Sequence, residues 1–121
     1  MISVNKSDEV KVSAITDLEG AAGVKKQVML GEEENVATFA MRKFTLEEEG
    51  YTPFHEHDWE HEVYVLGGRG RIKTDEGFLD VESGDAVYVP PNERHQFIND
   101  GREMEFLCLV PNRGEPTVAE R

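Results

Sequence analysis

Short apolar runs rich in Val, Phe and Tyr recur along the chain between turn-forming residues, and none of them follows a helical period. This pattern predicts an all-β protein. Turn-forming residues at 67–68, 74–77, 82–85 and 99–101 separate several of the runs. Even spacing of this kind favours a closed antiparallel barrel or a jelly roll. The eight expected strands are residues 24–30, 36–45, 62–66, 69–73, 77–81, 86–89, 95–98 and 103–110.

The two ends of the chain have weaker patterns than the middle. Residues 1–20 are expected to form an N-terminal edge segment that contacts a partner subunit in a homodimer, because their apolar side chains have no place in an eight-stranded barrel. These side chains are Val10, Val12, Ile15 and Leu18. Residues 21–111 are the expected barrel, which is a single domain. Residues 112–121 lack an apolar pattern and are expected to be a loose C-terminal tail.

Composition narrows the set of partners. The formal net charge of −12 repels phosphate backbones and anionic lipid surfaces, so neither nucleic acid nor a membrane is expected as a partner. No hydrophobic run approaches the roughly 18 residues of a membrane span. The first residues lack the apolar stretch of a signal peptide, which predicts a cytoplasmic location. A single cysteine, Cys108, excludes an internal disulfide.

All four histidines of the chain fall in two segments, with His55, His57 and His61 in the first and His95 in the second. In an extended chain, residues 55, 57 and 61 point to one face, and that face continues into the apolar positions of the following strand. It is therefore the expected barrel interior. Neutral imidazole is the commonest metal-binding side chain, so the four histidines are predicted to bind one divalent transition metal.

A helical alternative exists for part of this cluster. His57 and His61 are four residues apart, which is the spacing of a helical zinc-binding pair. Pro53 lies just upstream, however, and the β-branched residues Val63 and Val65 follow. These neighbours disfavour a helix, and the strand interpretation is kept.

Two motifs of this chain resemble those of the cupin family. The first motif reads Gly50, His55, His57, then His61 or Glu62, and Gly68. The second reads Gly84, Pro90, Asn92, His95 and Asn99, where Asn92 replaces the glycine of the family. Asn tolerates the left-handed conformation that glycine supplies, so the replacement is mild. The resemblance covers about residues 36–110 and implies a single-domain jelly-roll barrel (a double-stranded β-helix), usually dimeric, with one metal ion inside.

The identity of the third ligand separates two kinds of cupin. Many members use a glutamate, and loose spacing would allow Glu62 to fill that position. Glu62 has the wrong parity to share a face with His57, and the spacing to Gly68 fits His61 better. We therefore expect His61 to be the ligand. The resulting set is similar to that of the four-histidine manganese cupins.

Four neutral imidazoles leave the charge of a divalent ion uncompensated, and four ligands on an octahedral ion leave two positions open. Imidazole binds many transition metals, so ligand type alone does not identify the ion. The resemblance to the four-histidine subgroup favours manganese, with Fe, Cu, Ni or Zn as alternatives. It implies an oxidoreductase, either a dioxygenase or an enzyme of peroxide-dependent oxidation or cleavage of a small organic substrate. The alternatives are a non-redox isomerase or lyase acting on a sugar or keto acid, and a small-molecule binding module.

Residues 103–110 alternate between two kinds of side chain, with apolar residues at the even positions. The even positions should face inward and line the cavity, and they are Met104, Phe106, Cys108 and Val110. Cys108 is then either a small buried hydrophobe or a cavity thiol open to oxidation. Such a wall favours an apolar or aromatic substrate. Apart from the histidines, the inward positions are expected to offer no convincing titratable group for non-redox chemistry, and no catalytic residue is assigned.

Overall fold

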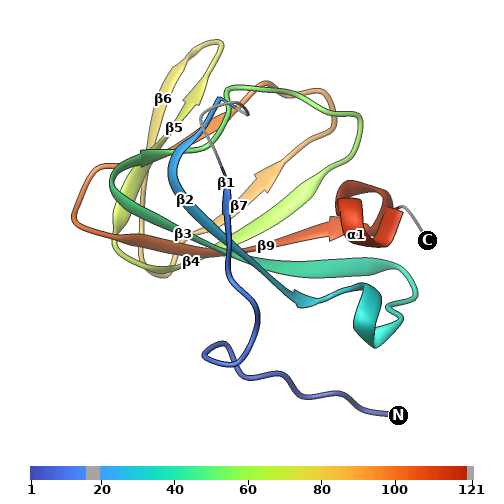
Figure 1. Cartoon of the computed structure of the whole chain (residues 1–121). Helices are drawn as coiled ribbons and strands as arrows, with labels where there is room; N and C mark the ends of the chain where they lie inside the picture. The colour runs from blue at the N-terminus through green and yellow to red at the C-terminus, as the bar shows by residue number, and fades with distance from the viewer. Residues whose placement is uncertain (16–19, 120–121) are drawn as a thin grey trace.

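The computed structural model describes residues 1–15 and 20–119, and strands dominate these ranges (Figure 1). The strands are β1 (Ser13–Ile15), β2 (Ala22–Leu30), β3 (Phe39–Tyr51), β4 (His61–Gly67), β5 (Arg69–Thr74), β6 (Gly77–Glu82), β7 (Ala86–Val89), β8 (Gln96–Asn99) and β9 (Met104–Pro111). The helical elements are the short 3₁₀ turns η2 (Glu32–Glu34) and η3 (Asn112–Gly114) and the helix α1 (Pro116–Ala119). The all-β prediction is confirmed. Within the same ranges no helix is long and apolar enough to cross a membrane.

The strands form one curled antiparallel sheet in the order β6-β5-β8-β3-β9-β4-β7, with β2 paired to β3 and β1 paired to β2. The long strand β3 joins the two halves of the sheet. Most of β3 pairs with β2 and β9, and its last residue, Tyr51, pairs with Ile98 of β8. Figure 1 shows the strands curling around a common interior, as in a jelly-roll barrel.

Alternation of side chains builds the core. In β4 the residues His61, Val63 and Val65 are buried, whereas Glu62 between them is exposed. In β9 all four even-numbered side chains from 104 to 110 are at most 2% exposed, so the predicted inward set is confirmed. The two strands are neighbours, and Val65 lies opposite Phe106. Burying each large apolar side chain of this kind stabilises the fold by about 1.5–3 kcal/mol.

Two turn positions require a left-handed backbone. Gly68 has a φ of +80°, and a Cβ there would lie 2.0 Å from the carbonyl oxygen of Glu103. Glycine therefore allows β4 to turn into β5 beneath that carbonyl. Asn92 has a φ of 64°, which is the conformation expected for an asparagine in place of the motif glycine.

The boundaries of β3 correct the expected strand 36–45. The strand begins at Phe39 and continues to Tyr51, through the acidic residues 47–49. The predicted strand ends at residue 45, before this run of charges, and is therefore too short at its C-terminal end. Pairing with β2 continues to the partners Ala22 and Tyr51 across an irregularity, where Glu49 has a φ of 64°. The exposed glutamates lie within this irregularity, between Leu46 and Tyr51, which both pair with β2.

The two ends of the chain differ from expectation in different ways. At the N-terminus β1 pairs with β2 of the same chain, so an edge strand is present, while Leu18 lies outside the described residues. At the C-terminus a loose tail was expected over 112–121, and residues 112–118 instead pack against the barrel. Glu115 is 0% and Val118 4% exposed. The apolar pattern does not predict this packing, because the most buried residue of the segment 112–118 is a carboxylate, Glu115. Residues 120–121 lie outside the described ranges.

Candidate metal centre

The two histidine segments meet across an isolated β-bridge between His55 and His95. The amide of His55 donates to the carbonyl oxygen of His95 at 3.1 Å, and the amide of His95 donates back at 3.0 Å. The amide of Asn92, in its left-handed turn, donates to the carbonyl oxygen of His57 at 2.7 Å. Backbone hydrogen bonds thus hold the first motif beside the second. Residues 56–60 are loop, which excludes the helical alternative for His57 and His61.

The four imidazoles form one cluster. Ring nitrogens of His55, His57 and His95 lie within 4.8 Å of one another. Nε2 of His61 lies 3.1 Å from Nε2 of His95, and the ring centroids of His57 and His61 are 5.0 Å apart. An ion about 2.0–2.1 Å from each nitrogen holds neighbouring ligands about 3 Å apart, and the His61–His95 pair has this spacing. The structure brings all four predicted histidines together, and exposed Glu62 faces away from them.

Hydrogen bonds at Nδ1 orient the rings. Nδ1 of His57 donates to the carbonyl oxygen of Trp59 at 3.0 Å, and Nδ1 of His95 donates to that of Glu93 at 2.7 Å. A carbonyl accepts only, so the proton must sit on Nδ1 and the lone pair on Nε2. His61 differs, since its Nδ1 lies 3.0 Å from Sγ of Cys108. Partners of this kind hold metal-binding imidazoles in place.

Burial keeps these histidines neutral. Desolvation, followed by repulsion from neighbouring imidazoles, lowers the pKa of His55 to about 4 and that of His61 to about 2. Burial also lowers the pKa of His57 and His95, opposed by their hydrogen bonds to carbonyl groups. At neutral pH all four rings are therefore in the uncharged form that binds metal ions.

A cavity of about 370 Å³ adjoins the histidines. Its wall includes four aromatic side chains. Phe106 stacks on Phe44 at 5.4 Å and on Phe97 at 4.7 Å between ring centroids, and Trp59 stacks on His57 at 4.3 Å. Such a wall favours a partly apolar occupant.

Only half of the four residues expected to line this cavity do so. Phe106 and Cys108 are in its wall, whereas Met104 and Val110 are not. Both are buried against glycines: a Cβ on Gly70 would lie 2.5 Å from the Met104 sulfur, and one on Gly114 would lie 3.0 Å from Cβ of Val110. Inward parity predicts burial, and the shape of the interior decides which buried residues face open space.

Charged side chains also reach the cavity, which corrects the expectation of no titratable group beyond the histidines. Lys26 of β2 and Arg42 of β3 are in its wall. Nζ of Lys26 lies 2.7 Å and Nη1 of Arg42 3.6 Å from Oε1 of the buried Glu115. Residues 26 and 42 share parity with buried Val24 and Ala40, so alternation could have located both cations. No sequence signal marked Glu115.

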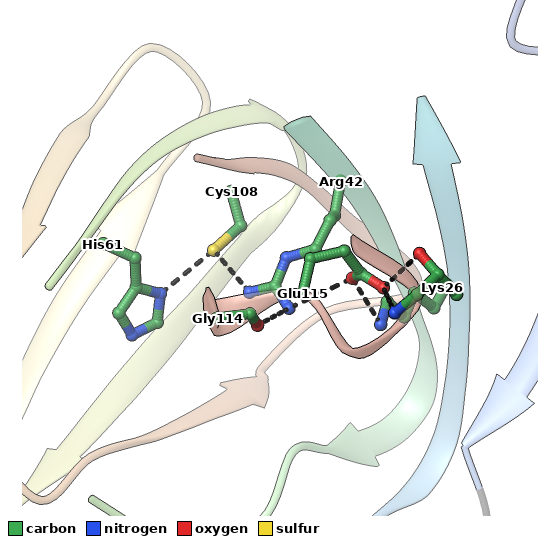
Figure 2. Close-up of polar contacts among 7 residues, drawn as sticks. Lys26, Arg42, His61, Cys108, Gly114 and Glu115 are labelled. Carbon is green, nitrogen blue, oxygen red and sulfur yellow. Dashed lines mark hydrogen bonds and ion pairs between the residues drawn. The ribbon is translucent and has the colours of Figure 1, made fainter. Parts of the chain in front are cut away.

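Cys108 connects the histidines to these charges, as Figure 2 shows. Its sulfur is 3.0 Å from Nδ1 of His61 and accepts a hydrogen bond from Nη2 of Arg42 at 3.1 Å. Nη1 of Arg42 donates to the carbonyl oxygen of Gly114 at 3.3 Å. Burial raises the pKa of the Cys108 thiol, opposed by the charge of Arg42, so the group is a neutral thiol at pH 7. Cys108 is therefore both a buried residue and part of the cavity wall, and its oxidation stays a prediction.

The fold and the histidine motifs define a family. The model of the cupin domain matches residues 42–110, more than half of the chain, and the protein therefore belongs to the cupin family. An uncharacterized protein of Methanocaldococcus jannaschii is 36% identical over 59 residues. The match covers 47% of this chain and 47% of that relative, so it spans about half the length of the curated relative.

Solved structures with this fold come from proteins with different activities. The polyketide cyclase RemF of Streptomyces resistomycificus is similar with a TM-score of 0.85 at 29% identity, covering 92% of this chain and 80% of the cyclase. A predicted oxalate decarboxylase of Thermotoga maritima has a TM-score of 0.79 at 24% identity, covering 90% of this chain and 98% of that protein. Cupins therefore differ in activity, and the function must be argued from the site.

Proposed function

We propose that the protein is a metal-dependent oxidoreductase in which His55, His57, His61 and His95 hold one divalent transition metal, most favourably manganese. The observation that carries this proposal is the meeting of four neutral imidazoles beside a cavity, with no carboxylate of the described residues among them. Structural metal sites are usually closed, whereas four ligands on an octahedral ion leave room for a substrate.

When held by the four histidines, the ion would supply redox or Lewis-acid chemistry. The side chains of the chain have separate tasks. Phe44, Phe97, Phe106 and Trp59 pack against an apolar part of the substrate and exclude water. The carbonyl groups of Trp59 and Glu93 hold two of the imidazoles in the binding tautomer. Dioxygenation and peroxide-dependent oxidation or cleavage of a small organic molecule both fit this arrangement.

The test begins with the metal. Elemental analysis of protein purified without added metal should find close to one transition-metal ion per chain, and similarity to the four-histidine cupins favours Mn over Fe, Cu, Ni and Zn. The loaded protein should then oxidise an aromatic alkene with an organic peroxide. His61→Ala should lose most of the metal and of the activity, whereas Glu62→Ala, its exposed neighbour, should keep both. Full metal retention by His61→Ala, or no metal-dependent oxidation with Mn, Fe or Cu, would contradict the proposal.

A non-redox reaction is the second candidate. Lys26, Arg42 and Cys108 in the cavity wall provide charge and acidic protons that an isomerase, lyase or cyclase can use. The 29% identity to a polyketide cyclase over 92% of this chain points the same way. This candidate predicts a product at the same oxidation state as the substrate, without consumption of oxygen or peroxide.

A further inference from the structure

The charges in the cavity wall do not balance. Lys26 and Arg42 carry two positive charges, and Glu115 is the carboxylate paired with them. All three side chains are at most 16% exposed. One positive charge therefore remains inside a protein whose formal net charge is −12. A divalent ion on the histidines would add to this excess, and unpaired charge in a poorly hydrated interior is unfavourable.

Arg42 is the less compensated of the two cations. Glu115 lies at 2.7 Å from the Lys26 ammonium and at 3.6 Å from the Arg42 guanidinium. The guanidinium otherwise donates to neutral groups, the Cys108 sulfur and the Gly114 carbonyl (Figure 2). Its buried Nε has no hydrogen-bond partner among the described residues. Arg42 lines the cavity, and a planar guanidinium without a close carboxylate partner is suited to an incoming carboxylate.

The residues around Arg42 indicate what the rest of the ligand would be. Its guanidinium lies 5.2 Å from the ring centroid of Phe44, which stacks on Phe106. The same cavity of about 370 Å³ reaches the four histidines, a size typical of small-molecule sites. Positive charge, aromatic rings and the histidine cluster thus meet within one small space.

We propose that this cavity binds a small organic carboxylate, with the anionic group toward Arg42 and an apolar or aromatic part between the rings beside the histidines. This inference deepens the proposed function by naming its substrate class, and it rests on that function for the reaction that follows binding. It revises the purely apolar substrate that the alternation of residues 103–110 favours.

The experiment compares benzoate with benzamide, a neutral analogue of nearly the same shape. Trp59 is the one tryptophan of the chain and lines the cavity, so its fluorescence reports binding there. In metal-free protein at constant ionic strength, benzoate should bind about tenfold or more tightly than benzamide. Arg42→Met should remove this preference. Lys43→Met is the matched control, because the adjacent side chain pairs with Glu105 on the other face of β3 and should change nothing.

A second variant separates anion binding from folding. The double variant Lys26→Met, Glu115→Gln removes one charge of each sign and leaves Arg42 in place. It should bind benzoate within about threefold of the unmodified protein, because the net charge of the wall is unchanged. Circular dichroism checks that each variant is folded.

The outcomes distinguish this inference from the proposed function. Equal binding of benzoate and benzamide, or benzoate binding unchanged in folded Arg42→Met, overturns the carboxylate site whatever the metal content. If Arg42→Met does not fold, loss of the benzoate preference in the double variant overturns it instead. Charge-selective binding in a protein that takes up no metal would support the carboxylate site while the oxidoreductase proposal fails.

Discussion

The Cys108 side chain contacts both a candidate metal ligand and a buried cation. Its sulfur lies between Nδ1 of His61 and the Arg42 guanidinium, at 3.0 and 3.1 Å. Two of the other imidazoles use backbone carbonyls for this purpose. His61 is thus held by a side chain, which substitution can remove, whereas a backbone carbonyl stays in place.

Replacing Cys108 should weaken metal binding. Cys108→Ala removes the partner of His61 Nδ1, and loss of such a partner weakens metal affinity about 10- to 100-fold. Cys108→Ser keeps a polar atom in the same place and should restore most of the affinity. Competition with a chelator measures both constants. Equal affinity of the Ala variant and the unmodified protein would show that Cys108 does not position His61.

The lowered pKa values of the histidines predict how stability of the metal-free protein depends on pH. Unfolded chains take up protons on histidine near pH 6.5, whereas folded His61 does so only near pH 2 and His55 near pH 4. Between these values the unfolded state binds more protons. The free energy of unfolding should therefore be unaffected by these groups above about pH 6.5 and fall as the pH decreases below it.

His61 is 5% exposed, and it alone should lower the free energy of unfolding by about 2 kcal/mol between pH 6.5 and pH 5. Urea unfolding of chelator-treated protein at several pH values in this range measures the slope. His61→Gln should have a shallower slope. An identical slope in both proteins would mean that His61 titrates normally in the folded state.

At the scale of elements, one buried carboxylate, that of Glu115, joins the C-terminal segment to β2 and β3. Burial alone would raise the pKa of Glu115, but the hydrogen bond and charge of Lys26 keep it lowered. The backbone amide and hydroxyl of Thr117 also donate to Glu115, at 3.1 and 3.0 Å. Residues 112–118 are thus attached to β2 and β3 by charge as well as by packing.

Glu115→Gln should therefore be strongly destabilising. It leaves Lys26 and Arg42 buried without an anion, and breaking a buried pair costs about 3–5 kcal/mol. Glu47→Gln is the matched control, because Glu47 pairs with Lys25 on the surface, where both side chains are about half exposed. A surface pair contributes at most about 1 kcal/mol. Urea unfolding compares the two variants, and similar stabilities would contradict the importance of Glu115.

At the scale of the molecule, we predict a homodimer that uses the N-terminal edge. Strand β1 pairs only with β2 among the described strands, which leaves its outer edge free, and Val12 beside it is 53% exposed. Light scattering at micromolar concentration should give twice the mass of the 13.7 kDa chain. Val12→Asp should favour the monomer, whereas Phe78→Asp, on the β5–β6 hairpin, should not. A monomer mass for the unmodified protein would refute the prediction.

The two-residue period of a strand is a local property, and the sequence by itself was therefore enough for features that depend on it. It determined the β class, the inward faces of β4 and β9, and the choice of His61 over Glu62 as the buried side chain. Turn chemistry is also local, so the left-handed Asn92 was predictable. The same period could have located Arg42, which shares parity with buried Ala40.

Contacts between distant segments were decided only by the tertiary structure. Glu115 lies in a polar C-terminal segment, and its burial follows from cations on β2 and β3, which no local pattern connects to it. Met104 and Val110 are as buried as Cys108, but the curvature of the sheet places only Cys108 beside the cavity. Strand β3 continues past its acidic residues to Tyr51, which pairs with Ala22 of β2 and Ile98 of β8. Periodicity specifies which face a side chain takes, whereas its neighbours depend on how the whole sheet closes.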